Sequence, residues 1–159
     1  MSMFIKISDV EGDSTVKGFE DQIEAQSFSF STSQSTSPIR SNTSHTDGRP
    51  SLSLFNFTKS CDKASPIICK KLWTGATLAT AEFTACRDEG GALIAFLTIK
   101  MENVVVANYS VSGGNGMPYE NVALNFAKIE VNYIPQKNEG GTSGNVPASY
   151  DLSTESAED

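Results

Sequence analysis

Hydrophobic and polar residues alternate along most of the chain, in short runs rich in Val, Ile, Phe and Thr. Gly, Asn, Asp and Pro separate these runs. A period of two is typical of β-strands with one buried face, and the separating residues are typical of turns. The pattern predicts strands at 3–8, 22–32, 51–58, 77–86, 92–101, 104–112 and 119–134. The predicted fold class is mainly β, an antiparallel β-barrel or a two-sheet sandwich.

One segment has helical spacing instead. Ser65 precedes Pro66, which fits a capping hydroxyl followed by proline at the first helical position, where a missing N–H costs nothing. Gly75 supplies a C-terminal stop. The residues at helical spacing between them are Ile67, Ile68, Lys71 and Leu72. We therefore expect a single short α-helix of about three turns.

Two predicted strands change phase part-way along. In 119–134 the apolar positions shift by one residue near Ala127 and Lys128, and in 22–32 they shift between Ala25 and Phe28. A shift of this kind inside a strand is what a β-bulge produces, and bulges bend sheets into barrels.

Residues 92–99 and 104–107 are apolar on both faces of their strands. An antiparallel strand with one wet face should alternate, so the second face must also be covered. One short helix covers little area. Contact with another subunit and a two-layer sandwich with these strands at its centre explain the pattern equally well.

Charge and length of apolar runs exclude several classes of partner. The net charge is -7, and acidic residues gather in the final STESAED. The sequence has no basic stripe, so neither nucleic acid nor an anionic membrane surface is expected as a partner. No window approaches the ~20 apolar residues of a membrane helix, so no membrane insertion is expected. The first residues do not resemble a signal peptide, so we expect synthesis in the cytoplasm and any export by a route that reads no leader.

The three cysteines, Cys61, Cys69 and Cys86, form no Cys-x-x-Cys pair. An intracellular chain of this size needs no disulfide. We expect small thiols that are buried or half-buried.

Three motifs match functional patterns only loosely. Ser60 and Lys63 fit Ser-x-x-Lys, but the Ser-Asp-Asn and Lys-Thr-Gly elements of that chemistry are missing from the sequence. His45 is the single histidine, in a polar loop, which excludes multi-histidine metal sites and gives no support to a Ser-His-Asp site. An acidic segment has Ser14 where a calcium loop turns on glycine. Its oxygen-bearing positions are Asp9, Glu11, Asp13, Thr15 and Glu20.

We interpret these three features as a turn before the helix, an exposed loop histidine and a solvated acidic loop. No catalytic residue, cofactor site or metal site is predicted, and the protein is not expected to be an enzyme.

A glycine cluster, residues 112–116, follows a predicted strand and could be a phosphate cradle. A cradle needs a following helix that aims its N–H groups at the anion. The residues that follow alternate with period two, so they predict a strand. The cluster is therefore predicted to connect two antiparallel strands, with glycines that permit positive φ.

Several stretches resemble one family, in its order and at similar spacing, and together they cover most of residues 3–137. They are MFIKISDVEGDSTVKGFEDQIEAQSFSFSTSQ, GRPSLSLFNFTKSCDKASP, FLTIKMENVVVANYSVSGGNG and ENVALNFAKIEVNYIPQK. The chain resembles Hcp, the hemolysin co-regulated protein family of bacterial type VI secretion systems.

The resemblance implies a β-barrel with one helix packed on its side, six copies of which form a ring with an open centre. Rings of the family stack into a tube that carries the spike protein VgrG at its tip. A contractile sheath drives the tube out of the bacterial cell, and the lumen holds effector proteins. Two alternatives stay open at this point: a secreted soluble β-barrel binding module and a phage-type tail-tube protein.

The resemblance also implies roles for particular residues. Ser29 lies between two aromatic residues that share the other face of the strand, and it matches a family motif whose serine faces the lumen. Ser29 is therefore predicted to line the lumen. Contacts between subunits or rings are predicted for Leu97 and Val105, whose neighbours Phe96 and Val104 point to the opposite side. The same role is predicted for the loop residues Ser112, Gly113, Gly114 and Asn115.

The chain departs from the family in two places. Residues 33–48 match it weakly, although 37–50 resembles the family's extended hairpin between stacked rings and holds one acidic residue, Asp47. The chain ends in acidic residues where many members have a tryptophan and a basic ending. We predict one domain over 1–137 and a C-terminal extension over 138–159 whose acidic end is partly disordered.

Overall fold

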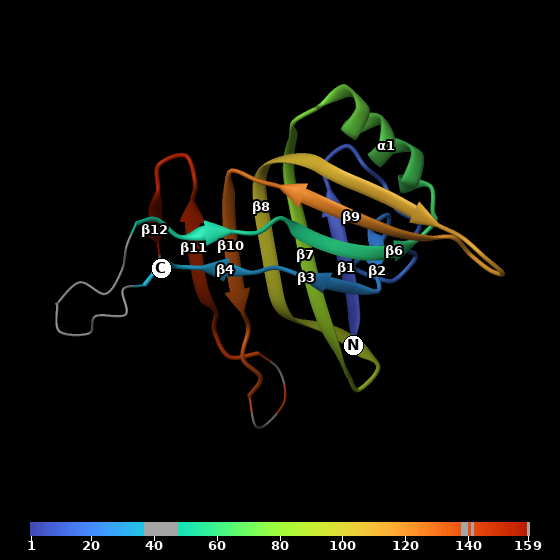
Figure 1. Ribbon diagram of the computed structural model, residues 1–159. Helices are drawn as coiled ribbons and strands as arrows, with labels where there is room; N and C mark the ends of the chain where they lie inside the picture. The colour runs from blue at the N-terminus through green and yellow to red at the C-terminus, as the bar shows by residue number, and fades with distance from the viewer. Residues whose placement is uncertain (37–47, 138–139, 141, 159) are drawn as a thin grey trace.

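The computed structural model describes residues 1–36, 48–137, 140 and 142–158. In this part of the chain one helix and twelve strands form, nearly all of them in a single antiparallel barrel with a flanking extension (Figure 1). The elements are β1 Ser2–Ile7, β2 Ile23–Ala25, β3 Ser27–Ser29, β4 Thr32–Ser33, β5 Ser51–Leu52, β6 Phe55–Ser60, α1 Ala64–Thr74, β7 Leu78–Glu89, β8 Ala92–Ser112, β9 Tyr119–Asn125, β10 Lys128–Tyr133, β11 Val146–Asp151 and β12 Ser156–Glu158.

The barrel closes because one long strand belongs to two sheets. β1 lies between β2 and β7, and β7 pairs with the first part of β8. The last part of β8 pairs with β9, β9 pairs with β6, and β6 pairs with β3. Gln26, between β2 and β3, donates its N–H to the Thr58 carbonyl at 2.7 Å and brings the two open edges together. The sequence was right to predict a mainly β antiparallel fold.

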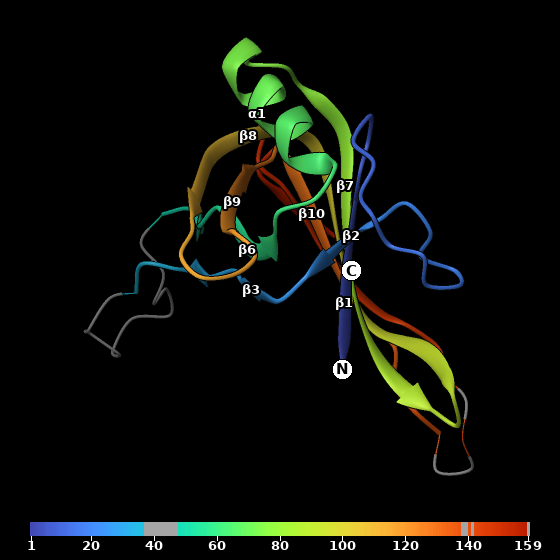
Figure 2. The same cartoon turned by 90° about the vertical axis from the view of Figure 1, so that its right-hand side faces the viewer.

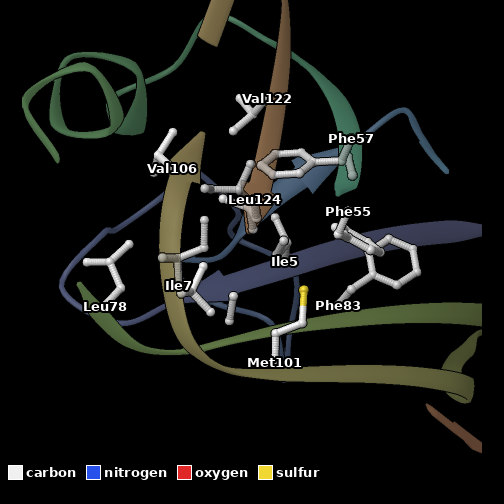
Figure 3. Close-up of a cluster of buried hydrophobic side chains, with 14 of the residues drawn as sticks. Ile5, Ile7, Phe55, Phe57, Leu78, Phe83, Met101, Val106, Val122 and Leu124 are labelled. Carbon is white, nitrogen blue, oxygen red and sulfur yellow. The ribbon is translucent and has the colours of Figure 1, made fainter. Parts of the chain in front are cut away.

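Aromatic and aliphatic side chains from all sides of the barrel fill its interior (Figure 3). Phe28 lies 4.4 Å from Phe83 between ring centroids, and Phe55 lies 5.4 Å from Phe83. Burial of one such side chain stabilises the fold by about 1.5–3 kcal/mol. The alternation read from the sequence therefore reports which residues face this core.

The predicted strands 92–101 and 104–112 are one bent strand, β8, in the structure. Asn103 adopts a left-handed conformation with φ of 51° inside it, and the register with β9 shifts between Val106 and Asn108. The prediction of two strands was wrong because the polar pair at 102–103 interrupts the apolar pattern without ending the strand. The bend lets β8 leave β7 and join β9.

The predicted strands 22–32 and 119–134 are each broken in the structure. The chain leaves β1 after β2 and joins β6 as β3, and it leaves β6 after β9 and joins β8 again as β10. The phase changes therefore mark exchanges between sheets, so the prediction of bulges at these points was wrong. The predicted strand 51–58 is likewise divided into β5 and β6.

Helix α1 begins at Ala64, two residues before the predicted first helical residue Pro66. Asp62 Oδ1 accepts the Ala64 N–H at 3.0 Å, and Ser65 Oγ accepts the Asp62 N–H at 3.1 Å. These two bonds form a capping arrangement in which Asp62, and not Ser65, satisfies the first free amide. Gly75 ends the helix with φ of 62°, as the sequence predicted. Ala64 and Ile68 belong to the barrel core, so α1 closes over it.

Residues 146–158 extend the sheet beyond the barrel. β11 pairs with β10, and β12 pairs with β11 through Ser149 and Glu158. No strand was predicted after residue 134, whereas the structure has β11 and β12 there. The partly disordered acidic end stays a prediction. The division of the chain at 137 stays a prediction.

The tip of the β7–β8 hairpin projects away from the barrel (Figure 2). Its apolar residues 93–97 are half-buried, which answers in part how the doubly apolar segment is covered. In the described part of the chain no helix has the length and apolar character that crossing a membrane requires.

Candidate interaction surfaces

One outer face of the barrel carries side chains without charge, mostly small polar ones around the buried Ala123. On β3, Phe28 turns inward to contact Phe83, so Ser27 and Ser29 turn outward and are exposed. Cross-strand partners continue this face, because Ser29 pairs with Asn56 and Ser27 with Thr58. We call it the uncharged face. Its residues, on β3, β6, β8 and β9, are Ser27, Ser29, Asn56, Thr58, Asn108, Ser110 and Asn121.

The uncharged face is held by hydrogen bonds across its strands. Ser27 Oγ and Thr58 Oγ1 lie 2.6 Å apart, and Gln26 Nε2 donates to Ser60 Oγ at 2.7 Å. A shallow hollow of about 210 Å³ lies over Ser29, Asn56 and Asn121. The structure thus places Ser29 on an exposed wall of neutral donors and acceptors, and its position relative to a lumen stays a prediction.

The opposite sheet of the barrel presents charges of alternating sign. Lys6, Glu82, Lys100 and Glu130 are successive cross-strand partners on β1, β7, β8 and β10, and all four are exposed. Neighbouring opposite charges favour strand register. The molecule therefore has one charged wall and one uncharged wall.

An ionic cluster built on the fully buried Lys59 and Glu120 holds α1 against the strands that carry the uncharged face. Lys59 Nζ donates to Glu120 Oε2 at 2.7 Å, to Asp62 Oδ1 at 2.7 Å and to Ser65 Oγ at 3.0 Å. Ser65 Oγ also donates to Glu120 Oε2 at 2.8 Å, and Tyr109 Oη donates to Glu120 Oε1. Lys59 and Glu120 have no exposed side-chain area. The cluster links β6, β8, β9 and the first turn of α1.

The electrostatics of this cluster follow from its hydrogen bonds. Burial alone raises the pKa of Glu120, but the bonds donated by Lys59, Tyr109 and Ser65 and the charge of Lys59 outweigh burial and hold this pKa below its ordinary value. Burial, together with the bond to Glu120, raises the pKa of Tyr109. Glu120 is therefore ionised and Tyr109 protonated at neutral pH.

Sequence analysis missed this cluster, although a signal was present. In β6, Lys59 continues the buried phase of Phe55 and Phe57, and in β9, Glu120 begins the buried phase of Val122 and Leu124. A lysine and a glutamate at buried positions of two strands should pair, because an isolated buried charge is very costly.

The glycine cluster connects β8 and β9, as the sequence predicted. Ser112 pairs with Tyr119, and the loop between them is exposed. Gly116 has φ of 143°, a backbone conformation that favours glycine. A side chain on Gly113 or Gly114 would meet no atom within 4 Å. The predicted contact role of Ser112, Gly113, Gly114 and Asn115 stays a prediction.

The two predicted contact residues on β8 occupy different environments. Val104 is buried in the core while Val105 is half-buried on the other face, paired with Asn125. Phe96 and Leu97 are both half-buried and both pack against the core cluster. Val104 and Val105 therefore have clearly different environments, whereas the environments of Phe96 and Leu97 are nearly the same.

The loose motifs do not assemble a reaction centre in the described residues. Lys63 Nζ lies 3.3 Å from Asp21 and 4.0 Å from Glu11, while Ser60 accepts a bond from Gln26. No group of three potential metal ligands gathers among these residues. His45, Asp47 and most of the loop 37–50 lie outside the described residues. Of the cysteines, Cys86 is buried and Cys69 half-buried as expected, but Cys61 is exposed, which corrects that prediction.

The fold and its surfaces define a class: a closed antiparallel barrel with one flanking helix and a broad uncharged wall, suited to protein contacts. The family model for the type VI secretion system effector Hcp matches residues 4–133. The chain belongs to the Hcp family of type VI secretion proteins. Members of this family are structural secreted proteins that oligomerise in type VI secretion tubes, and the family is not one of enzymes.

Individual relatives agree with this assignment. The protein hcp1 of Pseudomonas aeruginosa strain PAO1 is 34% identical over 152 residues, covering 94% of this chain and 93% of that protein. A solved type VI secretion effector from Yersinia pestis has a TM-score of 0.76 at 26% identity, covering 94% of this chain and 98% of that one. Hcp1 from Salmonella typhimurium shares the fold, with a TM-score of 0.80 at 22% identity over 99% of this chain and 98% of that one.

Proposed function

We propose that the protein is the subunit of a type VI secretion inner tube. Six copies form a ring with an open centre, rings stack, and a contractile sheath expels the tube with the spike protein VgrG at its tip. Effector proteins travel in the lumen. The observation that carries the proposal is the uncharged face, built on the four neighbouring strands β3, β6, β9 and β8 and containing Ser29.

The uncharged face suits a lumen wall for a physical reason. The chain has a net charge of -7. A lumen wall that carried part of this charge would attract or repel cargo according to the charge of the cargo. Neutral hydroxyls and amides instead offer hydrogen bonds whose strength changes little with salt. Cargo bound at this face should therefore be retained equally at low and high ionic strength.

Native mass spectrometry and electron microscopy test the ring. We expect hexamers that appear as rings with an open centre. A monomer at every concentration would overturn the tube proposal and favour the alternative of a soluble secreted binding module.

A gold label tests the position of Ser29. In a Cys61→Ser background, Ser29→Cys is coupled to a maleimide gold cluster, and Lys70→Cys on the exposed side of α1 provides the matched control. We expect gold inside the ring opening for position 29 and at a larger radius for position 70. Gold at the outer rim for position 29 would remove Ser29 from the lumen without changing the ring itself.

A further inference from the structure

Two surfaces without charge lie at opposite ends of the molecule (Figure 1). The first is the tip of the β8–β9 hairpin, residues 110–119, which we call the hairpin tip. The second is a groove between the β4–β5 pair and the β10–β11 sheet, which we call the end groove. The ionic cluster contributes to neither of them, and the hairpin tip shares only Ser110 with the residues named for the uncharged face.

The hairpin tip exposes three large apolar side chains within ten residues. Val111 is 55% exposed, Met117 71% and Tyr119 45%. Val111 pairs with Glu120 and Tyr119 pairs with Ser112, so these two side chains lie on opposite faces of the hairpin, with Met117 in the turn between its strands. The tip thus exposes apolar side chains on both of its faces, and exposed apolar surface of this extent marks an interaction site. The glycines at 113, 114 and 116 keep the projection narrow, and residues 110–119 include no charged side chain in a chain with 12 basic and 19 acidic residues.

The end groove has the matching chemistry. It has a volume of about 190 Å³ and is lined mainly by apolar side chains, again with no charged residue. Ala148 forms part of its exposed border. The large side chains that line it are Phe30, Leu52, Ile129, Val131 and Tyr150.

The separation between the hairpin tip and the end groove decides which copy's tip can occupy the groove. The hairpin tip of the same chain cannot reach it, because the two lie at opposite ends of the barrel (Figure 1). Two copies that each carry a net charge of -7 repel one another, and this repulsion is least where both surfaces are uncharged. Met117 is unbranched and flexible, so it adapts to an irregular apolar groove.

We propose that the hairpin tip of one copy docks into the end groove of a second copy, with Met117 as the central apolar anchor. A contact between two different surfaces is heterologous, so it repeats from copy to copy, either closing into a ring or continuing as a stack. The proposal rests on the tube function and assigns this contact to successive rings, where it joins them head to tail.

Cysteine trapping tests the contact directly. In a Cys61→Ser background, the double variant Met117→Cys, Ala148→Cys is treated with a short bis-maleimide. Both positions are exposed, so the fold should be retained, which circular dichroism checks. We expect a ladder of covalently linked chains and a 117–148 cross-link in the peptide map, whereas each single variant should give no ladder. A double variant that forms hexamers but no 117–148 link would overturn the proposal.

Two charged variants test the head-to-tail geometry. Met117→Asp disables the tip and Ala148→Glu disables the groove, so each variant alone should form rings that do not stack. Mixed, they retain one working combination, and electron microscopy should show stacks arrested at two rings. Met117→Leu is the control and should stack like the parent. Loss of the hexamer in either variant would place the contact inside the ring and overturn its assignment to stacking.

The proposed function fails in a distinguishable way. If the parent protein forms no hexamer, the tube subunit is wrong, whatever the cross-linking shows. If the parent forms hexamers and all variants stack like the parent, the tube stands and the tip-to-groove contact is wrong.

Discussion

Lys59 and Glu120 form a buried pair that helps to position α1 on the barrel. They come from strands that are neighbours in space but 61 residues apart in sequence, and every polar bond they make is to a group of the same cluster or to the adjacent backbone. A buried pair of this kind is not by itself a large source of stability, but its disruption is costly. Its clearest consequence is positional, since it connects the first turn of α1 to β6 and β9.

The first prediction concerns removal of one partner. Lys59→Met leaves the Glu120 carboxylate buried without its cation and should lower the free energy of unfolding by about 3–5 kcal/mol. Urea denaturation measures this change. Lys63→Met is the matched control, because Lys63 makes exposed ion pairs that contribute at most about 1 kcal/mol. Equal effects of the two substitutions would contradict the role given to the cluster.

The second prediction is a pH dependence from Glu120. Its pKa is lower in the folded protein than its ordinary value of 4.5, so ionised Glu120 stabilises the fold at neutral pH. This contribution is lost as the pH falls below that value and through the folded pKa. The urea midpoint of the parent should therefore fall more steeply between pH 6 and about 3 than that of Glu120→Gln. Parallel curves for the two proteins would refute the assignment.

At the scale of elements, the segment between β1 and β2 covers part of the barrel. Residues 8–22 fold over the outer side of β1, where Phe19 stacks on Phe4 with centroids 4.4 Å apart. This segment is joined to itself by backbone bonds, from the Gly12 N–H to Asp21 at 2.8 Å and from the Ser14 N–H to Gln22 at 3.1 Å. The acidic segment that resembled a calcium loop is thus a cover for an apolar side chain.

The third prediction tests this close approach. A Cβ on Gly12 would lie 2.3 Å from the Gln22 carbonyl oxygen, so Gly12→Ala forces backbone atoms apart. We expect a loss of stability of about 1–3 kcal/mol, measured by thermal denaturation. Gly113→Ala meets open space and should leave the midpoint unchanged. A neutral Gly12→Ala would show that the segment moves freely over β1.

At the scale of the whole molecule, the two walls of the barrel differ in charge, and the hairpin tip and the end groove add two uncharged ends. The surfaces that face different sides of the molecule therefore differ in charge and polarity. Val105, the residue predicted to contact a neighbouring subunit in the proposed ring, follows the fully buried Val104 in the chain, so substitutions at the two positions can be compared directly.

The fourth prediction uses these neighbours. Val104→Asp puts a charge into the core and should unfold the chain or destabilise it by more than about 3 kcal/mol. Val105→Asp lies on the half-buried face and should give a folded monomer that no longer forms hexamers. Circular dichroism and native mass spectrometry separate the two outcomes. Hexamers that persist in Val105→Asp would exclude Val105 from the ring contact.

The sequence by itself determined which residues face the core, the presence of one short helix, the Gly75 stop and the hairpin at 112–116. These features depend on local periodicity and on backbone conformation, which neighbouring residues decide. It also contained the family resemblance, and it placed the side chains of Ser29 and Phe28 on opposite faces of their strand.

Only the tertiary structure decided where β2, β9 and β8 change partners, because an exchange between sheets depends on distant strands and leaves only a shift of phase in the sequence. It also decided that Lys59 meets Glu120 and that the chain after 145 pairs with β10, since cross-strand contacts carry no local signature. The placement of the hairpin tip and the end groove at opposite ends belongs to the same kind of information. Each of these properties is set by the closure of the barrel, which brings together residues that the sequence keeps far apart.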